Sequence, residues 1–427
     1  MIFTRLSLNH DFHKITKINM IFKMKRIIIF CLLLFVGYVL SGQNCVQWRY
    51  DRTGIYSKET GLMKSWPASG PELLWKFDGL GRGYSSVSIA DNKIFVTGYH
   101  DGKGYLYIMN LDGKLQNKIE YGPEWDSDSY VGARSTVMHD DGKFYIVSGL
   151  MELSCYETQS LKLLWKKNYA KDFGAKNTAH GWNGPPLIVG EKLIIAPGGK
   201  DHHIVALNKS TGELIWSSKG ATENDMAGYA TCIYIGDQQT PQVFAMMSGH
   251  IIGVDISNGK LLWSHHHTNR FREHPNTPEY YDGMALGMSD YGKGSVMLRL
   301  TNGGRSVEKV WESTDLSHKT GNTLKFGDYV YGSGEKTGWH CVEWKTGKTI
   351  YSDNSFSVGS IIAADGLLYC YGEKGEMALV KPNPQKFDIV SRFPITLGTE
   401  QHWAHPVIYR GVLYVRHGDV LMAYKIK

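Results

Sequence analysis

The sequence has few cysteines, and they are not paired. It contains 6 cysteines, with no C-x-x-C motif and no adjacent cysteine pair. One of them, Cys31, lies in an apolar segment that we expect to be removed on export. The others are Cys45, Cys155, Cys232, Cys341 and Cys370. An odd, dispersed set argues against a disulfide framework or a zinc site. These residues are most simply small buried hydrophobic side chains, and whether Cys341 and Cys370 come close enough to bond stays open.

Dense basic tracts are also missing. The 427 residues carry a net charge of +6, and charges of both signs are interspersed. A nucleic-acid surface needs clustered Lys and Arg, so nucleic acid is not an expected partner. The composition, 42% hydrophobic and 21% charged, is that of a chain with a large core.

A long hydrophobic run is the third absence. The apolar stretch at residues 27–40 is too short for a comfortable membrane span, so we expect no stable span. It follows Lys25 and Arg26 and precedes Ser41-Gly42, which is the order of a secretory signal peptide. Residues 1–42 are therefore predicted to be an N-terminal extension and signal peptide, with Met24 as an alternative start. We expect an exported, periplasmic or secreted monomer.

A lipid anchor is not expected. Cys45 invites a lipoprotein interpretation, but Asn44 stands where a small residue should precede a lipidated cysteine.

One eleven-residue motif, here called the phrase, recurs along the chain. Its clearest copy is Ala206-Leu-Asn-Lys-Ser-Thr-Gly-Glu-Leu-Ile-Trp216. Weaker copies occupy residues 155–165, 253–263 and 341–351, and a worn copy begins near Met109. The phrase predicts strand, tight turn, strand, because the Gly between two apolar runs supplies the positive φ of a hairpin turn. A repeat at this spacing determines the fold class.

Each phrase belongs to a longer four-stranded unit. Seven units span about residues 84–119, 134–169, 184–219, 229–265, 280–313, 321–353 and 359–393. The last, 405–426, has only three strands, and Glu72-Leu-Leu-Trp75-Lys-Phe77 has the form of its missing fourth. We therefore predict an all-β, eight-bladed propeller of four-stranded antiparallel blades over residues 70–427, closed by an N-terminal strand that joins the C-terminal blade. Residues 43–69 are a lead-in.

The repeated tryptophans are predicted to be structural. A large ring on the outer strand of one blade can pack against the Gly of its neighbour and dock the two blades.

The pattern Ala-x-Asn-x-x-Thr-Gly-x-x-x-Trp at residues 206–216 resembles the repeat of pyrroloquinoline-quinone-type (PQQ-like) propellers. That group includes quinoprotein alcohol dehydrogenases and the propeller lipoprotein of the outer-membrane assembly machinery. The resemblance covers nearly all of the mature chain and implies the fold. It does not imply a cofactor, because many members bind no quinone.

The quinone-dependent members typically show a ring of neighbouring cysteines, carboxylate and amide ligands for calcium, and a catalytic Asp. No adjacent cysteines occur here, and the nearest acidic residues to the loops discussed next are Asp225 and Glu400. PQQ with calcium is therefore expected only if the protein is a dehydrogenase. No other cofactor and no metal is implied.

Loops at one end of the channel are the expected site. In a propeller, the loop that leads into the innermost strand of each blade, here called an axial loop, lies on the same face as the loop between the second and third strands. Rigidly held loops of this kind usually carry binding groups. The residues predicted to bind substrate are Arg82, Arg134, Trp182, His202, His340, His402, Trp403, His405 and Arg416. The residues predicted to be catalytic are His180, His318 and Tyr229.

These residue types suit an anionic, sugar-like ligand, because Arg binds carboxylates and aromatic rings offer flat apolar faces. Glycoside hydrolysis needs two facing carboxylates, which these loops lack. A metal site at His402 and His405 is disfavoured, because residues three apart on a strand point to opposite faces.

β-Elimination from a uronic acid needs a cation, a base and an acid. Arg134 or Arg82 is a candidate for the first, His180 or His318 for the second, and Tyr229 or another His for the third. We therefore predict a carbohydrate-active propeller for uronic-acid-containing oligosaccharides, possessing lyase or dehydratase activity. A PQQ-dependent alcohol or sugar dehydrogenase and a non-enzymatic scaffold are the alternatives.

Overall fold

The structure, a computed structural model, describes residues 44–127, 130–176 and 178–427. The chain divides into two units, Met1–Asn44 and Cys45–Lys427. The predicted signal peptide at residues 1–42 lies outside the described residues. Within the described ranges, no helix has the length and apolar character that crossing a membrane requires.

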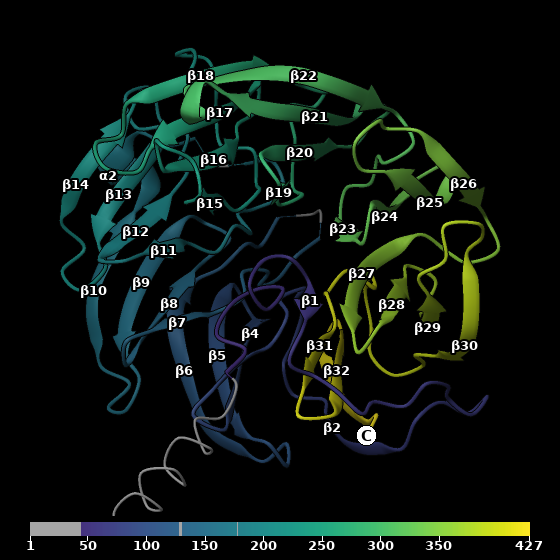
Figure 1. Ribbon diagram of the computed structural model, residues 1–427. Coiled ribbons are helices and arrows are strands. Elements are labelled where there is room, and N and C mark those ends of the chain that lie inside the picture. Colours follow the sequence, from purple (N-terminus) through teal and green to yellow (C-terminus); the bar gives the residue numbers. More distant parts are fainter. Residues whose placement is uncertain (1–43, 128–129, 177) are drawn as a thin grey trace, which may run out of the picture. The chain divides into compact units, whose positions relative to one another are not determined.

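The unit Cys45–Lys427 is a ring of eight sheets that follow one another in chain order (Figure 1). The strands of the first four blades, from the innermost outward, are as follows. Blade 1 contains β3 (Ser88–Ala90), β4 (Lys93–His100), β5 (Lys103–Asn110) and β6 (Leu115–Pro123). Blade 2 contains β7 (Met138–Asp140), β8 (Lys143–Val147), β9 (Glu152–Glu157) and β10 (Leu163–Asn168). Blade 3 contains β11 (Leu187–Val189), β12 (Lys192–Ile195), β13 (Ile204–Asn208) and β14 (Leu214–Ser218). Blade 4 contains β15 (Ile233–Ile235), β16 (Gln242–Met246), β17 (His250–Asp255) and β18 (Leu261–His266).

The other four blades complete the ring. Blade 5 contains β19 (Glu279–Tyr281), β20 (Met284–Ser289), β21 (Gly294–Thr301) and β22 (Ser306–Ser313). Blade 6 contains β23 (Thr323–Phe326), β24 (Tyr329–Gly334), β25 (Gly338–Glu343) and β26 (Thr349–Asp353). Blade 7 contains β27 (Gly359–Ala364), β28 (Leu367–Gly372), β29 (Glu376–Lys381) and β30 (Asp388–Pro394). Blade 8 contains β31 (Val407–Tyr409), β32 (Val412–His417), β33 (Val420–Lys425) and β2 (Leu73–Phe77). Two short helices, α2 (Tyr169–Phe173) and the 3₁₀ turn η1 (Asn302–Gly304), lie in connections.

Blade 8 closes the ring as predicted. Strand β2 pairs antiparallel with β33, and Trp75 lies opposite Ala423. The outer strand of the last blade is therefore supplied by a segment more than 300 residues earlier in the chain. This pairing leaves no blade without its fourth strand, which confirms the predicted propeller.

The repeated tryptophans dock neighbouring blades. The ring of Trp216 in blade 3 covers Gly259 of blade 4, where an added Cβ would lie 2.6 Å from the indole. The indole nitrogen of Trp216 donates a hydrogen bond to the carbonyl oxygen of Ile256 at 3.0 Å. The same arrangement joins Trp75 to Gly113, Trp165 to Gly212 and Trp311 to Gly347. Glycine is required in these turns, because φ there is positive and the indole leaves no room for a side chain.

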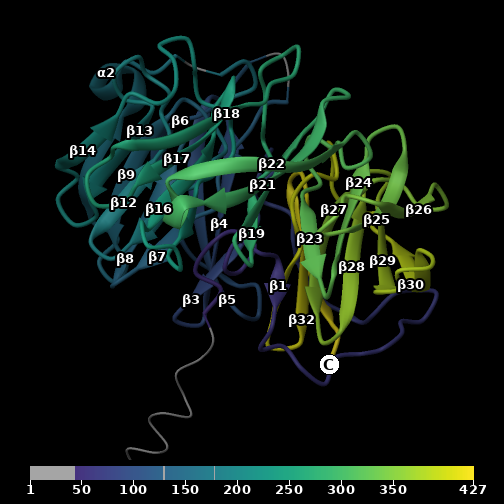
Figure 2. The same ribbon diagram turned by 45° about the horizontal axis from the view of Figure 1, so that its top comes forward.

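The centre of the ring contains residues 45–56, here called the axial plug. Cys45 forms a bridge with Ile89 of blade 1, and β1 (Ile55–Tyr56) pairs in parallel with the inner strand β27 of blade 7. Figure 2 shows β1 inside the ring, beside β27. The repeat pattern gives no indication of this segment, which the sequence analysis treated only as part of a lead-in.

Two buried arginines hold the plug. Arg49 donates to the carbonyl oxygens of Ile361 at 3.1 Å and Thr323 at 2.7 Å, in blades 7 and 6. Arg52 donates to the Thr231 hydroxyl and to the Pro186 carbonyl oxygen at the opposite side of the channel. The plug therefore bridges blades that are not neighbours in the ring.

Candidate functional site

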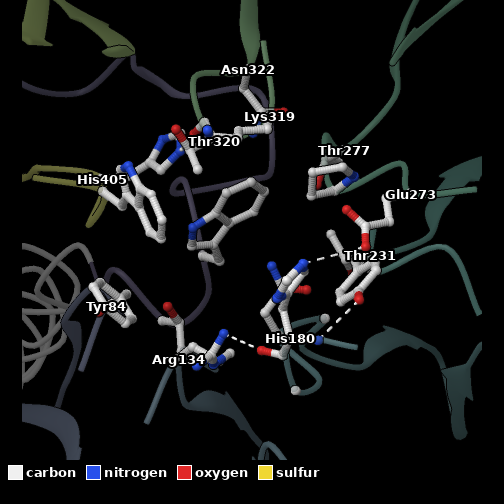
Figure 3. A pocket seen from close by; sticks show the side chains of 18 of the residues that line it. Tyr84, Arg134, His180, Thr231, Glu273, Thr277, Lys319, Thr320, Asn322 and His405 are labelled. Atoms are coloured by element: carbon white, nitrogen blue, oxygen red, sulfur yellow. Dashed lines mark hydrogen bonds and ion pairs between the residues drawn. The ribbon is translucent and has the colours of Figure 1, made fainter. Parts of the chain in front are cut away.

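A cavity of about 250 Å³ lies on the axis, between the plug and the axial loops (Figure 3). Trp48 of the plug contributes to its wall, together with residues from the axial loops of blades 1 to 6 and blade 8. The charged and histidine side chains that line it are Arg134, His180, Glu273, Lys319 and His405. The aromatic side chains are Trp48, Tyr84, Tyr130, Tyr229, Tyr291 and Trp403. A second cavity, of about 400 Å³, touches residues 46, 47 and 51–53 of the plug and the far ends of the inner strands.

Arg134 brings a positive charge to the wall and forms no ion pair with a carboxylate of the described residues. Its guanidinium donates to the carbonyl oxygens of His180, Tyr130 and, at 3.3 Å, Gly132. In the described part of the chain, the arginines that pair with a carboxylate are Arg82, Arg272 and Arg392, and Arg134 is not among them. Burial lowers the pKa of Arg134. Because three of its five N–H groups are engaged, two remain for a ligand.

His180 and Glu273 form a pair in the same wall. The Nε2 atom of His180 lies 3.5 Å from Oε1 of Glu273, and the Tyr291 hydroxyl donates to Oε2 of Glu273 at 3.1 Å. Figure 3 shows Arg134, His180 and Glu273 in sequence along this wall. The His180 side chain is 39% exposed, whereas that of Glu273 is 14% exposed. The carboxylate of Glu273 therefore orients the partly exposed imidazole of His180 in the cavity wall, within reach of a ligand.

The Tyr229 hydroxyl completes this group. It accepts a hydrogen bond from the backbone N–H of His180 at 3.2 Å. Burial, followed by the charge of Glu273, raises the pKa of Tyr229 to about 12. The phenol therefore keeps its proton at neutral pH and can donate it.

Aromatic rings form the rest of the wall. Trp403 lies between Tyr84 and Tyr130, with ring centroids 5.3 Å and 4.6 Å away. Lys319 approaches Trp403, with its Nζ 5.9 Å from the ring centroid, but pairs with Glu335 at 3.1 Å. Among the described residues, Arg134 is therefore the cation of this wall that forms no ion pair with a carboxylate, and the buried Glu124 acts on it only at longer range.

The backbone is strained at the same place. Tyr130, Tyr229 and Tyr291 have φ values of 55°, 76° and 59°. Bulky residues rarely adopt this left-handed region, and such outliers cluster at functional sites. Many of the other positive-φ positions are Asp or Asn, such as Asp91 and Asp365, in hairpin turns, where they are ordinary.

The structure brings five of the predicted residues to the cavity: Arg134, His180, Tyr229, Trp403 and His405. Of these, His405 is fully engaged. Its Nε2 donates to the Thr320 carbonyl oxygen at 2.8 Å, and its Nδ1 lies 3.4 Å from Nη1 of Arg49. Burial lowers the pKa of His405 to about 3, so the ring is neutral and links the plug to the wall.

The second predicted base, His318, does not line the cavity. Its side chain is fully buried, and burial lowers its pKa to about 4. The Nδ1 atom accepts a hydrogen bond from the backbone N–H of Thr320 at 3.2 Å. A ligand in the cavity cannot reach this ring, so His318 is a structural residue of its loop.

Two predicted arginines also lie outside the cavity. Arg416 is buried and donates to Ser85 and to the Thr97 carbonyl oxygen, which joins blade 8 to blade 1. Arg82 pairs with Glu400 at 3.0 Å on the surface. Neither one contributes to the cavity wall.

The four remaining predictions, Trp182, His202, His340 and His402, are also placed elsewhere. Trp182 is buried in a core cluster, and its indole donates to the Gly184 carbonyl oxygen at 2.8 Å. His340 lies between the hydroxyls of Thr337 and Ser352. His402 stacks on His417 with a centroid distance of 3.6 Å, and His202 contacts Phe173. Hydrogen bonds or ring packing therefore occupy these side chains.

Several lining residues are not among those predicted from the sequence, namely Trp48, Tyr130, Glu273 and Tyr291 among others. Glu273 lies in the loop at residues 267–278, which leads into blade 5 and was left out of the comparison of axial loops. Its presence corrects the expectation that the nearest acids are Asp225 and Glu400. Asp225 is buried and pairs with His250 at 2.7 Å.

The donor set does not fit a calcium-bound quinone. Glu273 is the carboxylate among the residues that line the cavity, and His180 and Tyr291 engage it. Among the described residues, no group of three or more His, Cys, Asp or Glu is arranged to hold a metal ion. The five described cysteines are unpaired and buried, and none of them lines the cavity. The ring of neighbouring cysteines and the acidic ligands of the quinone-dependent group therefore have no counterpart in this wall.

Two quinoprotein ethanol dehydrogenases are similar to this chain in sequence. The enzyme from Pseudomonas aeruginosa is 25% identical over 168 residues, and the enzyme from Pseudomonas putida is 24% identical over 164 residues. These matches cover 37% and 35% of this chain, but only 27% and 26% of the length of those enzymes.

Solved structures share the fold. BamB from Moraxella catarrhalis has a TM-score of 0.60 at 13% identity, over 83% of this chain and 99% of that one. Quinohemoprotein alcohol dehydrogenase from Comamonas testosteroni has a TM-score of 0.58 at 13% identity, over 90% of this chain and 80% of that one. The PQQ_2 family model, described as outer membrane protein assembly factor BamB, matches residues 112–353. Because that match covers more than half of the sequence, the chain belongs to the PQQ_2 family of PQQ-like propellers.

Proposed function

We propose that the axial cavity binds a small anionic, sugar-like ligand whose carboxylate meets Arg134. The observation that carries this proposal is a largely buried guanidinium, without an ion-pair partner among the described residues, in the wall of an aromatic-lined cavity. A guanidinium in such a place favours a carboxylate, which it binds through two parallel hydrogen bonds. The rings of Trp48, Tyr84 and Trp403 supply flat apolar faces for a sugar ring.

The chemistry proposed for this site is β-elimination from a uronic acid. The imidazole of His180 takes the proton from the carbon next to the carboxylate, and Glu273, which faces Nε2 at 3.5 Å, stabilises the imidazolium that forms. The released electron pair makes a carbon–carbon double bond, while the bond from the adjacent carbon to the glycosidic oxygen breaks. Tyr229 gives its proton to the leaving oxygen, and exchange with solvent restores both side chains. Arg134 lowers the cost of the charge that develops on the carboxylate.

The test is the ultraviolet absorbance of an unsaturated uronate after incubation with mono-, oligo- and polyuronates. We expect product with the parent protein and a loss of about 10²–10⁴-fold in rate for His180→Gln, which removes the proton acceptor. His402→Gln is the matched control, because His402 stacks on His417 outside the cavity. Absence of product with every uronate would refute the lyase proposal.

Quinone-dependent alcohol or sugar oxidation is the second candidate, because the matched relatives are quinoprotein ethanol dehydrogenases. The donor set argues against it, as described above. It predicts dye reduction with alcohols or sugars that depends on added PQQ and calcium. No quinone binding in a titration would remove this candidate.

A non-enzymatic scaffold is the third candidate, and the family description, an outer membrane protein assembly factor, supports it. It predicts co-purification with membrane proteins and no shift of melting temperature with small ligands.

The proposal of an exported protein rests on residues 25–43 of the sequence. We further propose that no lipid is attached at Cys45. The Cys45 thiol is buried, and burial raises its pKa to about 12. A lipid thioether would therefore displace packed core residues.

A further inference from the structure

An aromatic pair continues the wall of the axial cavity outward to solvent. Phe271 is 52% exposed, and its ring meets Tyr291 edge-on with a centroid distance of 4.5 Å. Tyr291 itself lines the cavity, where its hydroxyl donates to Glu273. One ring contact therefore connects an exposed aromatic side chain to the proposed reacting group.

Arg270 adds a cation to this pair. Its guanidinium carbon lies 4.6 Å from the ring centroid of Phe271 and 6.0 Å from that of Tyr291. In the part of the chain that the structure describes, Arg270 is not among the arginines that pair with a carboxylate. A cation–π contact at an exposed site is weak, so the guanidinium remains available to an anion.

The loop that carries Phe271 is held in place. The side-chain oxygen of Asn269 accepts a hydrogen bond from the backbone N–H of Phe271 at 2.9 Å, and its nitrogen donates to the Ser289 hydroxyl at 2.9 Å. Tyr291 is fixed in the left-handed region at φ 59°. Such a conformation persists only where the surrounding structure imposes it. The backbone that carries both rings is therefore held in place, which reduces the entropy lost on binding.

The size of the cavity limits what it encloses. Pockets for drug-sized ligands have volumes of roughly 300–1,000 Å³, whereas this cavity has about 250 Å³. A single sugar unit fits these dimensions, and a longer chain has to extend beyond the cavity. Tyr291 contacts Glu273 in the cavity wall and the exposed Phe271 contacts Tyr291, so a chain that extends from Glu273 past Tyr291 meets Phe271.

We propose that Arg270, Phe271 and Tyr291 form a second subsite, here called the rim subsite, for the next unit of an anionic oligosaccharide. This inference rests on the proposed function, because the first unit would occupy the axial cavity. The apolar face of the second sugar ring packs on Phe271, and its carboxylate meets Arg270. The ligand is thereby an oligouronate rather than a monosaccharide.

The test compares ligands of different length by calorimetric titration. The probes are mono-, di- and triuronates of the galacturonate and mannuronate series, titrated into His180→Gln protein so that turnover is slow during the titration. Adding Phe271→Ala is expected to lower the affinity for the triuronate about ten-fold and to leave that for the monouronate unchanged. Adding Arg270→Gln is expected to weaken the triuronate about five-fold, but not a triuronate in which only the unit at the rim subsite carries a methyl ester.

A matched control is Tyr234→Ala, because Tyr234 is 42% exposed and lines the second cavity instead. It should change neither affinity. If Phe271→Ala and Arg270→Gln alter no affinity while Arg134→Met removes binding, the rim subsite is refuted and the axial site stands. Equal losses for the mono- and triuronate in the Phe271→Ala variant would also refute it. If no uronate binds to the parent protein, both proposals fail.

Discussion

The two sides of the axial cavity are built from loops at equivalent positions, yet they differ in what they offer a ligand. The axial loops of blades 2 to 5 present Arg134, His180, Tyr229 and Glu273 to the cavity. The loops of blades 6 and 8 carry the same residue types, but His405 is hydrogen-bonded on both ring nitrogens and His318 is fully buried. The difference shows that a residue type at a loop position does not determine a role. The partners that surround the side chain determine it.

Arg134 and Arg416 show the same difference for two residues of the same type. Both are arginines at the cavity end of a blade, and burial lowers the pKa of both. Arg416 uses its donors to join blade 8 to blade 1, whereas Arg134 faces the cavity. Substitution of each by methionine should therefore separate stability from binding.

The largest effect is expected for Arg416→Met. It leaves buried acceptors at Thr97, Gly418 and Ser85 without their donor at the seam that closes the ring. Each unsatisfied buried group costs about 1–3 kcal/mol, so we expect the free energy of unfolding to fall by about 3 kcal/mol. Urea unfolding measures this. Arg392→Met is the control, since that side chain is 53% exposed, and should change stability by less than about 0.5 kcal/mol. An unchanged urea midpoint for Arg416→Met would show that Arg416 does not stabilise the fold, and the proposed difference between Arg416 and Arg134 would be wrong.

Arg134→Met should act on binding instead. Loss of a charge-assisted pair costs about 1.5–3 kcal/mol, so uronate affinity should fall about 30-fold by calorimetric titration. The melting temperature should change much less than for Arg416→Met, because the acceptors of Arg134 are exposed or only partly buried and water can replace the lost donors, whereas those of Arg416 are buried. Equal destabilisation by the two substitutions, without loss of uronate affinity, would mean that Arg134, like Arg416, has only a structural role.

The ring was predictable because its determinants are local. A turn Gly followed four residues later by Trp, as in Gly212 and Trp216, specifies both the hairpin and the docking ring. The closing strand at Leu73–Phe77 was predictable for the same reason, since it repeats the outer-strand pattern. These features depend on a few residues that are close in sequence or recur at a fixed spacing.

The site was only partly predictable, because its determinants are not local. Trp48 reaches the cavity from the plug, which belongs to no repeat. Glu273 lies in a long loop that cannot be aligned residue by residue with the axial loops of the other blades. His180 and His318 are alike in sequence, and only the packing of other loops buries one and exposes the other. The loop residues predicted a cationic, aromatic mouth, and burial determines which of these side chains line the cavity.

The smallest expected effect concerns the pH dependence of stability, which the buried side of the cavity should dominate. His318 has a folded-state pKa of about 4, below its unfolded value of about 6.5. Between these values the unfolded chain binds the extra proton, so stability falls as the pH is lowered through this window. Between about pH 7 and pH 5.5, His318 should account for a loss of about 1 kcal/mol in the free energy of unfolding.

His318→Gln should therefore show a smaller decline in the free energy of unfolding than the parent, measured by urea unfolding at the two pH values, whatever its stability at neutral pH. Leu316→Val changes a buried apolar side chain of the same loop, which does not titrate, and should keep the parental slope. An identical decline in His318→Gln would show that His318 is accessible enough to be protonated in the folded protein, and the two sides of the cavity would then differ less than their geometry indicates.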